Sequence, residues 1–268
     1  VLEYTEKFDK VKLTAETLEM SKEDLKKAAQ GVDKALYETM EKAAEKAGIK
    51  IVAYTIGADF LGEKGWEAEA ERLFSQVDIA EALGAPLMRH DVVYNLRKKP
   101  NYTYRHAIAE IAPLVNEISN YAKAKGIKTC SENHGYIIQA PERVEELILA
   151  VNNPNYGWLC DIGNFLCADA EPAHAVSIAA PYTFHVHAKD FLFKSGSEQK
   201  PMGYGITTNE GNYLRGTVVG HGIVPVKKCV DILKKSGYDG WMSIEFEGAE
   251  DNLQALKNGL ENLKMFVR

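Results

Sequence analysis

The sequence predicts a single (β/α)8 TIM barrel. Short apolar segments alternate with longer amphipathic segments along all 268 residues, which is the order of a parallel sheet covered by helices. No linker and no change in composition divides the chain, so we expect one domain over residues 1–268. No GxGxxG turn follows an early strand, which disfavours the alternative of an open doubly wound sheet.

Each element follows from its local pattern. Continuous apolar runs predict strands at residues 8–14, 49–56, 86–91, 128–132, 157–161, 183–187 and 241–245. Periodic apolar residues, capping residues and terminal glycines predict helices at residues 21–47, 65–83, 104–125, 141–151, 172–180, 225–236 and 250–266. The first of the eight strands is expected to be cryptic within residues 1–8 or to lie before Val1. Residues 191–222 exceed the usual connection length, which predicts a lid or binding loop.

Composition and charge indicate which kinds of partner and which compartment to expect. The chain is 46% apolar and carries a net charge of −6, with acidic and basic residues interleaved, so we expect no nucleic-acid partner. The four cysteines show no CxxC spacing, which favours buried thiols in a reducing compartment and hence a cytoplasmic location. No apolar run approaches the roughly 18 residues needed to span a bilayer, and no signal peptide is recognisable, so we expect no membrane partner.

Four predicted strands each end on a residue that commonly binds metal ions: Glu132, Asp161, His187 and Glu245. Since the carboxyl ends of parallel barrel strands meet at one mouth, we expect these side chains to share a site. Three carboxylates and one imidazole favour Mn²⁺, with Mg²⁺, Co²⁺ or Zn²⁺ as alternatives. Taken singly, the two glutamates are typical of helix caps, Asp161 is typical of a turn, and His187 is typical of a core histidine. Their shared position favours a metal site.

Further polar residues lie near the same predicted mouth. Two-residue periodicity places His134 on the face of Glu132, where it is a candidate proton donor, and Lys189 on the face of His187. His185 lies one layer deeper, as a core residue. The candidate substrate-binding residues are His90, Asn164, Lys189, Arg215 and His221. The alternatives are an ion pair for Lys189, a turn cap for Asn164 and a solvated position for Arg215.

Five motifs together resemble the xylose isomerase-like TIM barrels, a superfamily of sugar isomerases and epimerases that includes the endonuclease IV group. They are Glu-Asn-His-Gly (132–135), Asp-Ile-Gly-Asn (161–164), His-Val-His-Ala-Lys-Asp (185–190), Gly-His-Gly (220–222) and Gly-Tyr-Asp-Gly-Trp-Met-Ser-Ile-Glu (237–245). The resemblance spans about residues 50–266. It implies the same four metal ligands and, in many members, homo-oligomers.

Three positions depart from named relatives. Ketose 3-epimerases of this superfamily carry Glu, His and Arg where this chain has Ile138, Asn164 and Phe193, which disfavours epimerisation of free ketohexoses. Endonuclease IV-like enzymes need three metals and extra histidines, one of them at the position of Asn164, which disfavours phosphodiester cleavage.

The resemblance and the ligand set together predict a divalent-metal-dependent isomerase or epimerase acting on a keto sugar. In this hypothesis Glu132 or Glu245 removes a proton next to the carbonyl, His134 shares the proton transfer, and the cation stabilises the enediolate. The alternative is a lyase on the same site, which expels a leaving group from a keto sugar or keto-glycoside. A sugar-binding barrel without catalysis is the non-enzymatic alternative, disfavoured because uncompensated converging carboxylates are costly.

Overall fold

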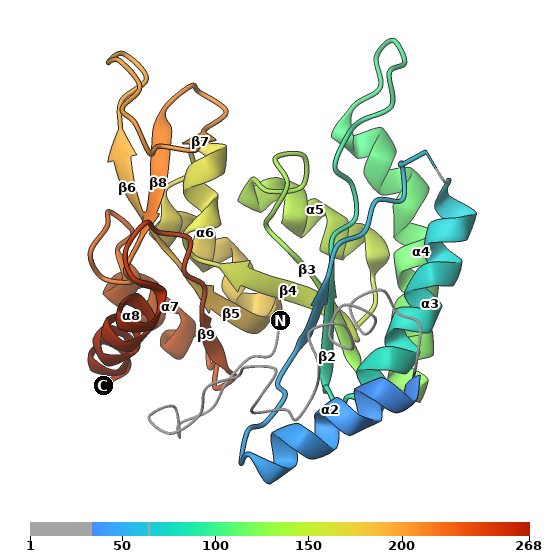
Figure 1. The fold of residues 1–268 in the computed structure, drawn as a ribbon. Helices are drawn as coiled ribbons and strands as arrows, with labels where there is room; N and C mark the ends of the chain where they lie inside the picture. Colours follow the sequence, from blue (N-terminus) through green and yellow to red (C-terminus); the bar gives the residue numbers. More distant parts are fainter. Residues whose placement is uncertain (1–33, 64) are drawn as a thin grey trace.

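The computed structural model of the chain describes residues 34–63 and 65–268. Its centre is a curled parallel β-sheet with helices around its outside (Figure 1). Six strands pair in the order β1-β2-β3-β4-β5-β9, and every pairing is parallel. Within the described residues, β1 and β9 form the two edges of this sheet. The strands are β1 (Tyr54–Ile56), β2 (Leu87–His90), β3 (Lys128–Glu132), β4 (Tyr156–Asp161), β5 (Thr183–Ala188) and β9 (Met242–Ile244).

Helices fill the connections between these strands and end close to the predicted positions. Helix α3 ends at Ala82 because Gly84 takes a left-handed backbone with φ of 63°, which a glycine adopts without strain. The helices are α2 (Lys34–Lys46), α3 (Trp66–Ala82), α4 (Tyr104–Ala124), α5 (Pro141–Val151), α6 (Pro172–Ala179), α7 (Val226–Lys235) and α8 (Asn252–Val267), with 3-10 turns η2 (Asn164–Ala168) and η3 (Ala180–Tyr182).

The two faces of the sheet have different roles. Met88, Trp158 and Val186 face the helices and belong to the large apolar core. The alternate residues Leu87, Cys130 and Leu159 join a second, smaller buried cluster on the opposite face. Because side chains alternate along a strand, the residues two positions later on β2, β3 and β4 share that second face. Polar groups at the strand ends therefore lie above a small apolar floor.

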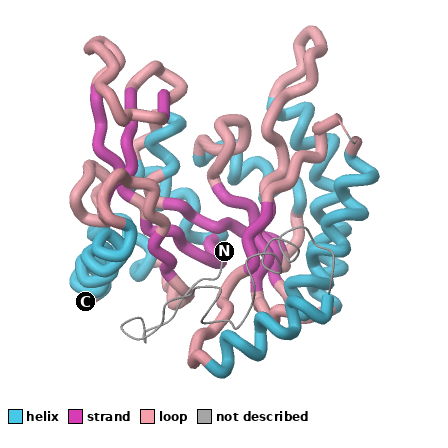
Figure 2. Tube along the Cα trace, viewed as in Figure 1, coloured by secondary structure: helices cyan, strands magenta, loops and turns pink. Residues whose placement is uncertain are grey.

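The prediction of a loop over residues 191–222 is wrong. This segment contains a three-stranded antiparallel sheet of β6 (Asp190–Lys194), β7 (Ile206–Thr207) and β8 (Tyr213–Thr217), in the order β6-β8-β7. Its strands rise beyond the carboxyl ends of the parallel strands (Figures 1 and 2). Phe191 and Leu214 are buried between it and η2, and the Tyr136 hydroxyl donates to the Thr207 carbonyl at 3.2 Å. This antiparallel sheet therefore packs against η2 and the segment around Tyr136.

The other predicted elements are confirmed where the structure describes them. Strand β1 is shorter than predicted, although residues 51–53 before it are buried. The predicted strand at residues 8–14, the first part of the helix over residues 21–47 and the cryptic strand lie outside the described residues. All four cysteines are buried thiols. Among the described helices, none combines the length and hydropathy needed to cross a bilayer.

Candidate metal centre

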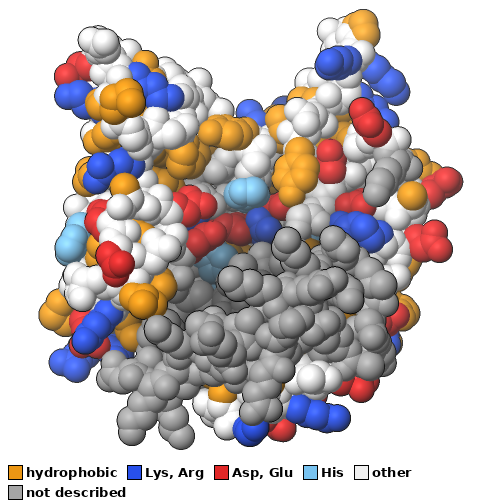
Figure 3. Space-filling view, in the orientation of Figure 1, with side chains coloured by type: hydrophobic (Ala, Val, Ile, Leu, Met, Phe, Trp, Pro, Cys, Tyr) orange, Lys and Arg blue, Asp and Glu red, His pale blue; other side chains and the backbone are white. Residues whose placement is uncertain are grey.

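The four predicted ligands converge at the carboxyl ends of β3, β4, β5 and β9. Asp161 pairs in register with His187, and the Glu245 backbone N–H donates to the Ala188 carbonyl at 3.0 Å. One ligand atom from each of Glu132, Asp161, His187 and Glu245 lies within 4.8 Å of the others. His187 Nδ1 lies 3.2 Å from Glu245 Oε2 and 3.6 Å from Glu132 Oε1. Figure 3 shows acidic and histidine side chains gathered between two raised shoulders of the surface.

Asp161 carries the clearest sign that this cluster suits a cation. Its Oδ1 accepts hydrogen bonds from the backbone N–H groups of Gly163 and Asn164 at 2.8 and 2.9 Å. Its Oδ2 is buried and accepts no hydrogen bond, although buried polar atoms are nearly always paired. Burial raises the pKa of Asp161 to about 8. A divalent cation among these oxygen donors would satisfy Oδ2, so the residues present fit such an ion.

Asn133 links the carboxyl ends of β3 and β4, the strands that carry Glu132 and Asp161. Its side-chain amide donates to the Asp161 carbonyl at 2.8 Å, and its Oδ1 accepts from the Asp161 backbone N–H at 3.0 Å. The same oxygen accepts from the Trp158 indole N–H at 3.0 Å. Asn133 is fully buried, so these bonds are shielded from water. They keep the ends of β3 and β4, and hence Glu132 and Asp161, in fixed relation.

A buried arginine that the sequence analysis did not select neutralises part of the site. Arg89 Nη2 lies 2.8 Å from Glu132 Oε2 and 2.7 Å from Asp91 Oδ1, and all three side chains are at most 7% exposed. Burial alone would raise the pKa of Glu132, but Arg89 and His187 outweigh it and lower that pKa. Glu132 is therefore held as a carboxylate with one oxygen committed to Arg89.

Lys189 supplies a second buried cation. Its Nζ lies 2.9 Å from Glu245 Oε2 and 3.6 Å from Asp161 Oδ2. Asn164 bridges the two sides of the site, donating from Nδ2 to Glu132 Oε1 at 3.0 Å and accepting from Lys189 Nζ at 3.3 Å. Both predicted substrate-binding residues therefore contact the proposed metal ligands directly.

His134 lies beside the cluster and is paired with a carboxylate. Its Nδ1 is 3.2 Å from Asp91 Oδ1, while the Tyr94 hydroxyl donates to Asp91 Oδ2 at 2.7 Å. The hydrogen bond with Asp91 raises the pKa of His134. The His134 side chain is 45% exposed whereas Asp91 is buried, so the imidazole is accessible from the mouth while its orienting carboxylate is not.

His90 does not face the site. It is fully buried and lies against Phe60 and Tyr156 on the helix-facing side of β2. The prediction that it binds substrate fails on strand periodicity, because Arg89 and Asp91 occupy the face shared with Glu132. His185 lies in the core below His187, as expected, with Nε2 2.9 Å from the Ser243 hydroxyl.

Arg215 and His221 lie outside the ligand cluster. Arg215 is half-buried on β8. The hydrogen bond from the Thr217 hydroxyl lowers the pKa of Glu250, and the charge of Arg215 makes a smaller contribution. His221 is exposed on a turn organised by the buried Asp190. The carboxylate of Asp190 accepts hydrogen bonds from the backbone N–H groups of Gly220, Gly222 and Val224 at 2.8 to 3.0 Å. The structure thus gives neither predicted residue a contact with the four ligands.

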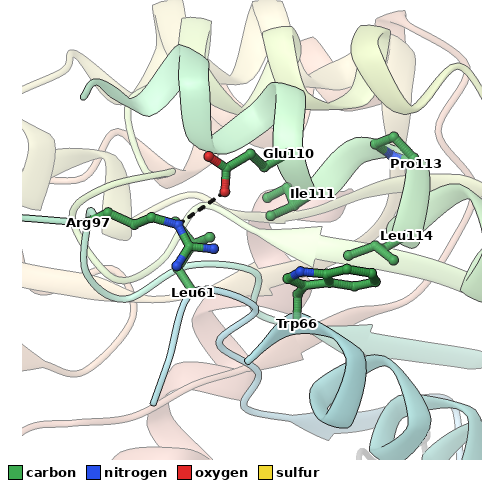
Figure 4. A pocket seen from close by; sticks show the side chains of 7 residues that line it. All are labelled: Leu61, Trp66, Arg97, Glu110, Ile111, Pro113 and Leu114. Carbon is green, nitrogen blue, oxygen red and sulfur yellow. Dashed lines mark hydrogen bonds and ion pairs between the residues drawn. The ribbon is translucent and has the colours of Figure 1, made fainter. Parts of the chain in front are cut away.

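A cavity of about 420 Å³ lies away from the metal centre, between α4 and the segment that leads into α3. Figure 4 shows Trp66 and Leu114 along its wall and the Arg97–Glu110 ion pair, 3.1 Å long, at one end. None of the four ligand residues lines it.

Comparison with known proteins identifies the family. A family model described as xylose isomerase-like TIM barrel matches residues 8–266. An inosose dehydratase of Histophilus somni is 30% identical over 142 residues, which cover 49% of this chain and 45% of that protein. The chain thus spans about half the length of the first curated relatives it matches.

Two solved structures share the fold. A xylose isomerase-like TIM barrel protein from Mycobacterium smegmatis in complex with magnesium has a TM-score of 0.68 at 16% identity, covering 88% of this chain and 79% of its own. D-psicose 3-epimerase with D-tagatose from Clostridium cellulolyticum H10 has a TM-score of 0.68 at 13% identity, with coverages of 88% and 85%. The chain belongs to the xylose isomerase-like TIM barrel family.

Proposed function

We propose that this chain is a divalent-metal-dependent dehydratase that removes a proton next to the carbonyl group of a polyhydroxylated ketone and then eliminates water. The observation that carries the proposal is the pairing of a metal-type cluster with one separate acid, His134, held by Asp91 at 3.2 Å. The similarity to inosose dehydratases supports the same reaction class.

Glu132, Asp161, His187 and Glu245 are the residues that would hold the ion. Their oxygen-rich donor set favours Mn²⁺, and Mg²⁺, Co²⁺ or Zn²⁺ are alternatives. A divalent cation bound there polarises a carbonyl group and so makes the adjacent C–H group more acidic.

We assign the base role to Glu245 and the acid role to His134. The Glu245 side chain is 36% exposed, whereas Glu132 is 4% exposed and one of its oxygens is committed to Arg89. Glu245 accepts the proton from carbon. The departing hydroxyl group accepts a proton from His134 Nε2, because Nδ1 faces Asp91, and leaves as water. The electron pair of the broken C–H bond forms the new C=C bond.

A second candidate is the isomerisation or epimerisation that the sequence predicts. It begins with the same proton removal, but the proton returns to carbon and no group leaves. Two glutamates within one cluster favour it, since one carboxylate can remove the proton and the other can return it. The ion pair of Glu132 with Arg89 counts against equal roles for the two glutamates, and for this reason we place dehydration first.

Incubation of the Mn²⁺-loaded protein with inososes and keto sugars in D₂O, followed by mass spectrometry, separates these reactions. Dehydration predicts a product lighter by one water, whereas isomerisation predicts unchanged covalent composition with deuterium uptake. In His134→Gln we expect deuterium exchange to continue while water loss falls at least about 100-fold. His174→Gln, a change of an exposed histidine on α6, is the matched control. Metal-loaded protein that neither exchanges a proton nor changes any substrate would refute the proposal.

A further inference from the structure

The Lys189 ammonium group contacts two carboxylates that would also hold a metal ion. Its Nζ lies 2.9 Å from Glu245 Oε2, 3.2 Å from Glu247 Oε2 and 3.6 Å from Asp161 Oδ2, with a side chain that is only 4% exposed. Two of these three carboxylates belong to the proposed ligand set. The lysine is therefore a cation that the chain itself supplies to the site.

The lysine and a divalent ion would use the same atoms. Asp161 Oδ1 is committed to two backbone N–H groups, which leaves Oδ2, the atom nearest Lys189, for a metal. Glu245 Oε2 is likewise the oxygen in contact with both Lys189 and His187. Two cations that share these oxygens repel each other, and repulsion is strong in a buried site because water does not screen it.

The backbone that carries Lys189 has little freedom to move away. A Cβ atom at Gly163 would lie 2.8 Å from the Lys189 carbonyl oxygen and 3.0 Å from its Cβ atom, so the two chain segments pass in direct contact. Adjustment must come from the side chain. Glu247, whose side chain is 50% exposed and which is not one of the ligands, offers an acceptor at the edge of the cluster.

We propose that Lys189 competes with the divalent metal for Asp161 and Glu245 and thereby determines the metal affinity of the site, with Glu247 holding the ammonium group when the metal is bound. This inference rests on the metal site of the proposed function. In metal-free protein the lysine keeps the converging carboxylates compensated. On metal binding its charge weakens the affinity, which favours a readily exchanged ion.

The test is calorimetric titration of Mn²⁺ into metal-free wild-type protein and the Lys189→Met variant, which removes the charge but retains an unbranched side chain. We expect Kd to fall at least tenfold in Lys189→Met. Lys194→Met is the matched control, because Lys194, the last residue of β6, pairs at 2.6 Å with the exposed Glu198, and its Kd should equal that of wild type. Thermal unfolding provides a second readout: metal-free Lys189→Met should melt below wild type and gain more from Mn²⁺.

Glu247→Gln tests the same idea without changing a buried residue. Without the Glu247 carboxylate, the ammonium group should lie closer to Asp161 and Glu245. The Kd for Mn²⁺ should therefore rise several-fold. Lys189→Met protein with wild-type or weaker Mn²⁺ affinity would overturn the inference, as would Glu247→Gln protein with unchanged affinity. Wild-type protein that binds no divalent ion would instead refute the metal site itself, so the two failures are distinguishable.

Discussion

Replacement of Arg89 by methionine tests whether the site depends on an internal counter-ion. The change removes the guanidinium group that lies 2.8 Å from Glu132 and 2.7 Å from Asp91, together with its 3.3 Å hydrogen bond to the Ile56 carbonyl. Both carboxylates are about 5% exposed. Without Arg89 both would lose their guanidinium partner, and Glu132 would remain buried close to the Asp161 carboxylate. Asp91 would keep its hydrogen bonds with His134 and Tyr94.

The expected cost is about 3–5 kcal/mol of unfolding free energy at pH 8 in metal-free protein, because breaking a buried ion pair leaves an uncompensated charge. The cost should shrink at lower pH. In wild type the pKa of Glu132 is depressed, so its contribution to stability is present above the ordinary Glu value and is lost as pH falls. Without Arg89 the pKa of Glu132 rises, so protonation relieves part of the penalty as pH falls.

Urea unfolding of wild type and Arg89→Met at pH 8 and pH 5 measures both effects. Arg97→Met is the matched control, since the Arg97–Glu110 pair is 31% and 43% exposed and should contribute at most about 1 kcal/mol. A loss below about 1 kcal/mol for Arg89→Met at pH 8, or a loss that grows as pH falls, would refute the reasoning.

Two further predictions concern stability. Burial lowers the pKa of His90 to about 4, so the folded state excludes a proton that the unfolded chain binds below its ordinary value of 6.5, and stability falls as pH falls. From pH 7 to pH 5, wild type should lose about 2 kcal/mol relative to His90→Leu in urea titrations, and an equal pH dependence of the two proteins would contradict this. Gly163→Ala should cost about 1–3 kcal/mol because its Cβ atom would lie 2.8 Å from the Lys189 carbonyl oxygen. Gly205→Ala, where no atom lies within 4 Å of the added Cβ, should unfold as wild type does, and equal losses in the two variants would exclude the contact as the cause.

The convergence of the four candidate ligands could be predicted from sequence because two signals coincide. Each ligand ends an apolar strand, and parallel strands in a barrel bring their carboxyl ends together. The same logic predicted that His134 and Lys189 lie at the mouth.

Arg89 was missed although a signal for it was present. Alternation along residues 87–91 places Leu87, Arg89 and Asp91 on one face and His90 on the other. His90 was selected because it is a histidine at a strand end, although it lies on the helix-facing side of the strand. A charged residue inside an apolar strand, two positions before an acidic one, is the pattern that identifies the buried counter-ion.

The antiparallel sheet of β6, β7 and β8 could not be predicted from the local sequence pattern. Leu192 pairs with Arg215 and Phe193 with Leu214, so its strands are joined by a long intervening segment. Such pairing depends on closing a long loop and on burial of Phe191 and Leu214 against η2. Neither can be read from the residues of either strand alone.

Metal binding by the purified protein tests the central claim most directly. Equilibrium dialysis against Mn²⁺, with elemental analysis of wild type and Asp161→Asn, should find about one ion per wild-type chain. The variant should bind little or none, since it loses the buried carboxylate oxygen that accepts no hydrogen bond. Wild-type protein that binds neither Mn²⁺ nor Mg²⁺, Co²⁺ or Zn²⁺, or a variant that binds Mn²⁺ as wild type does, would contradict the account.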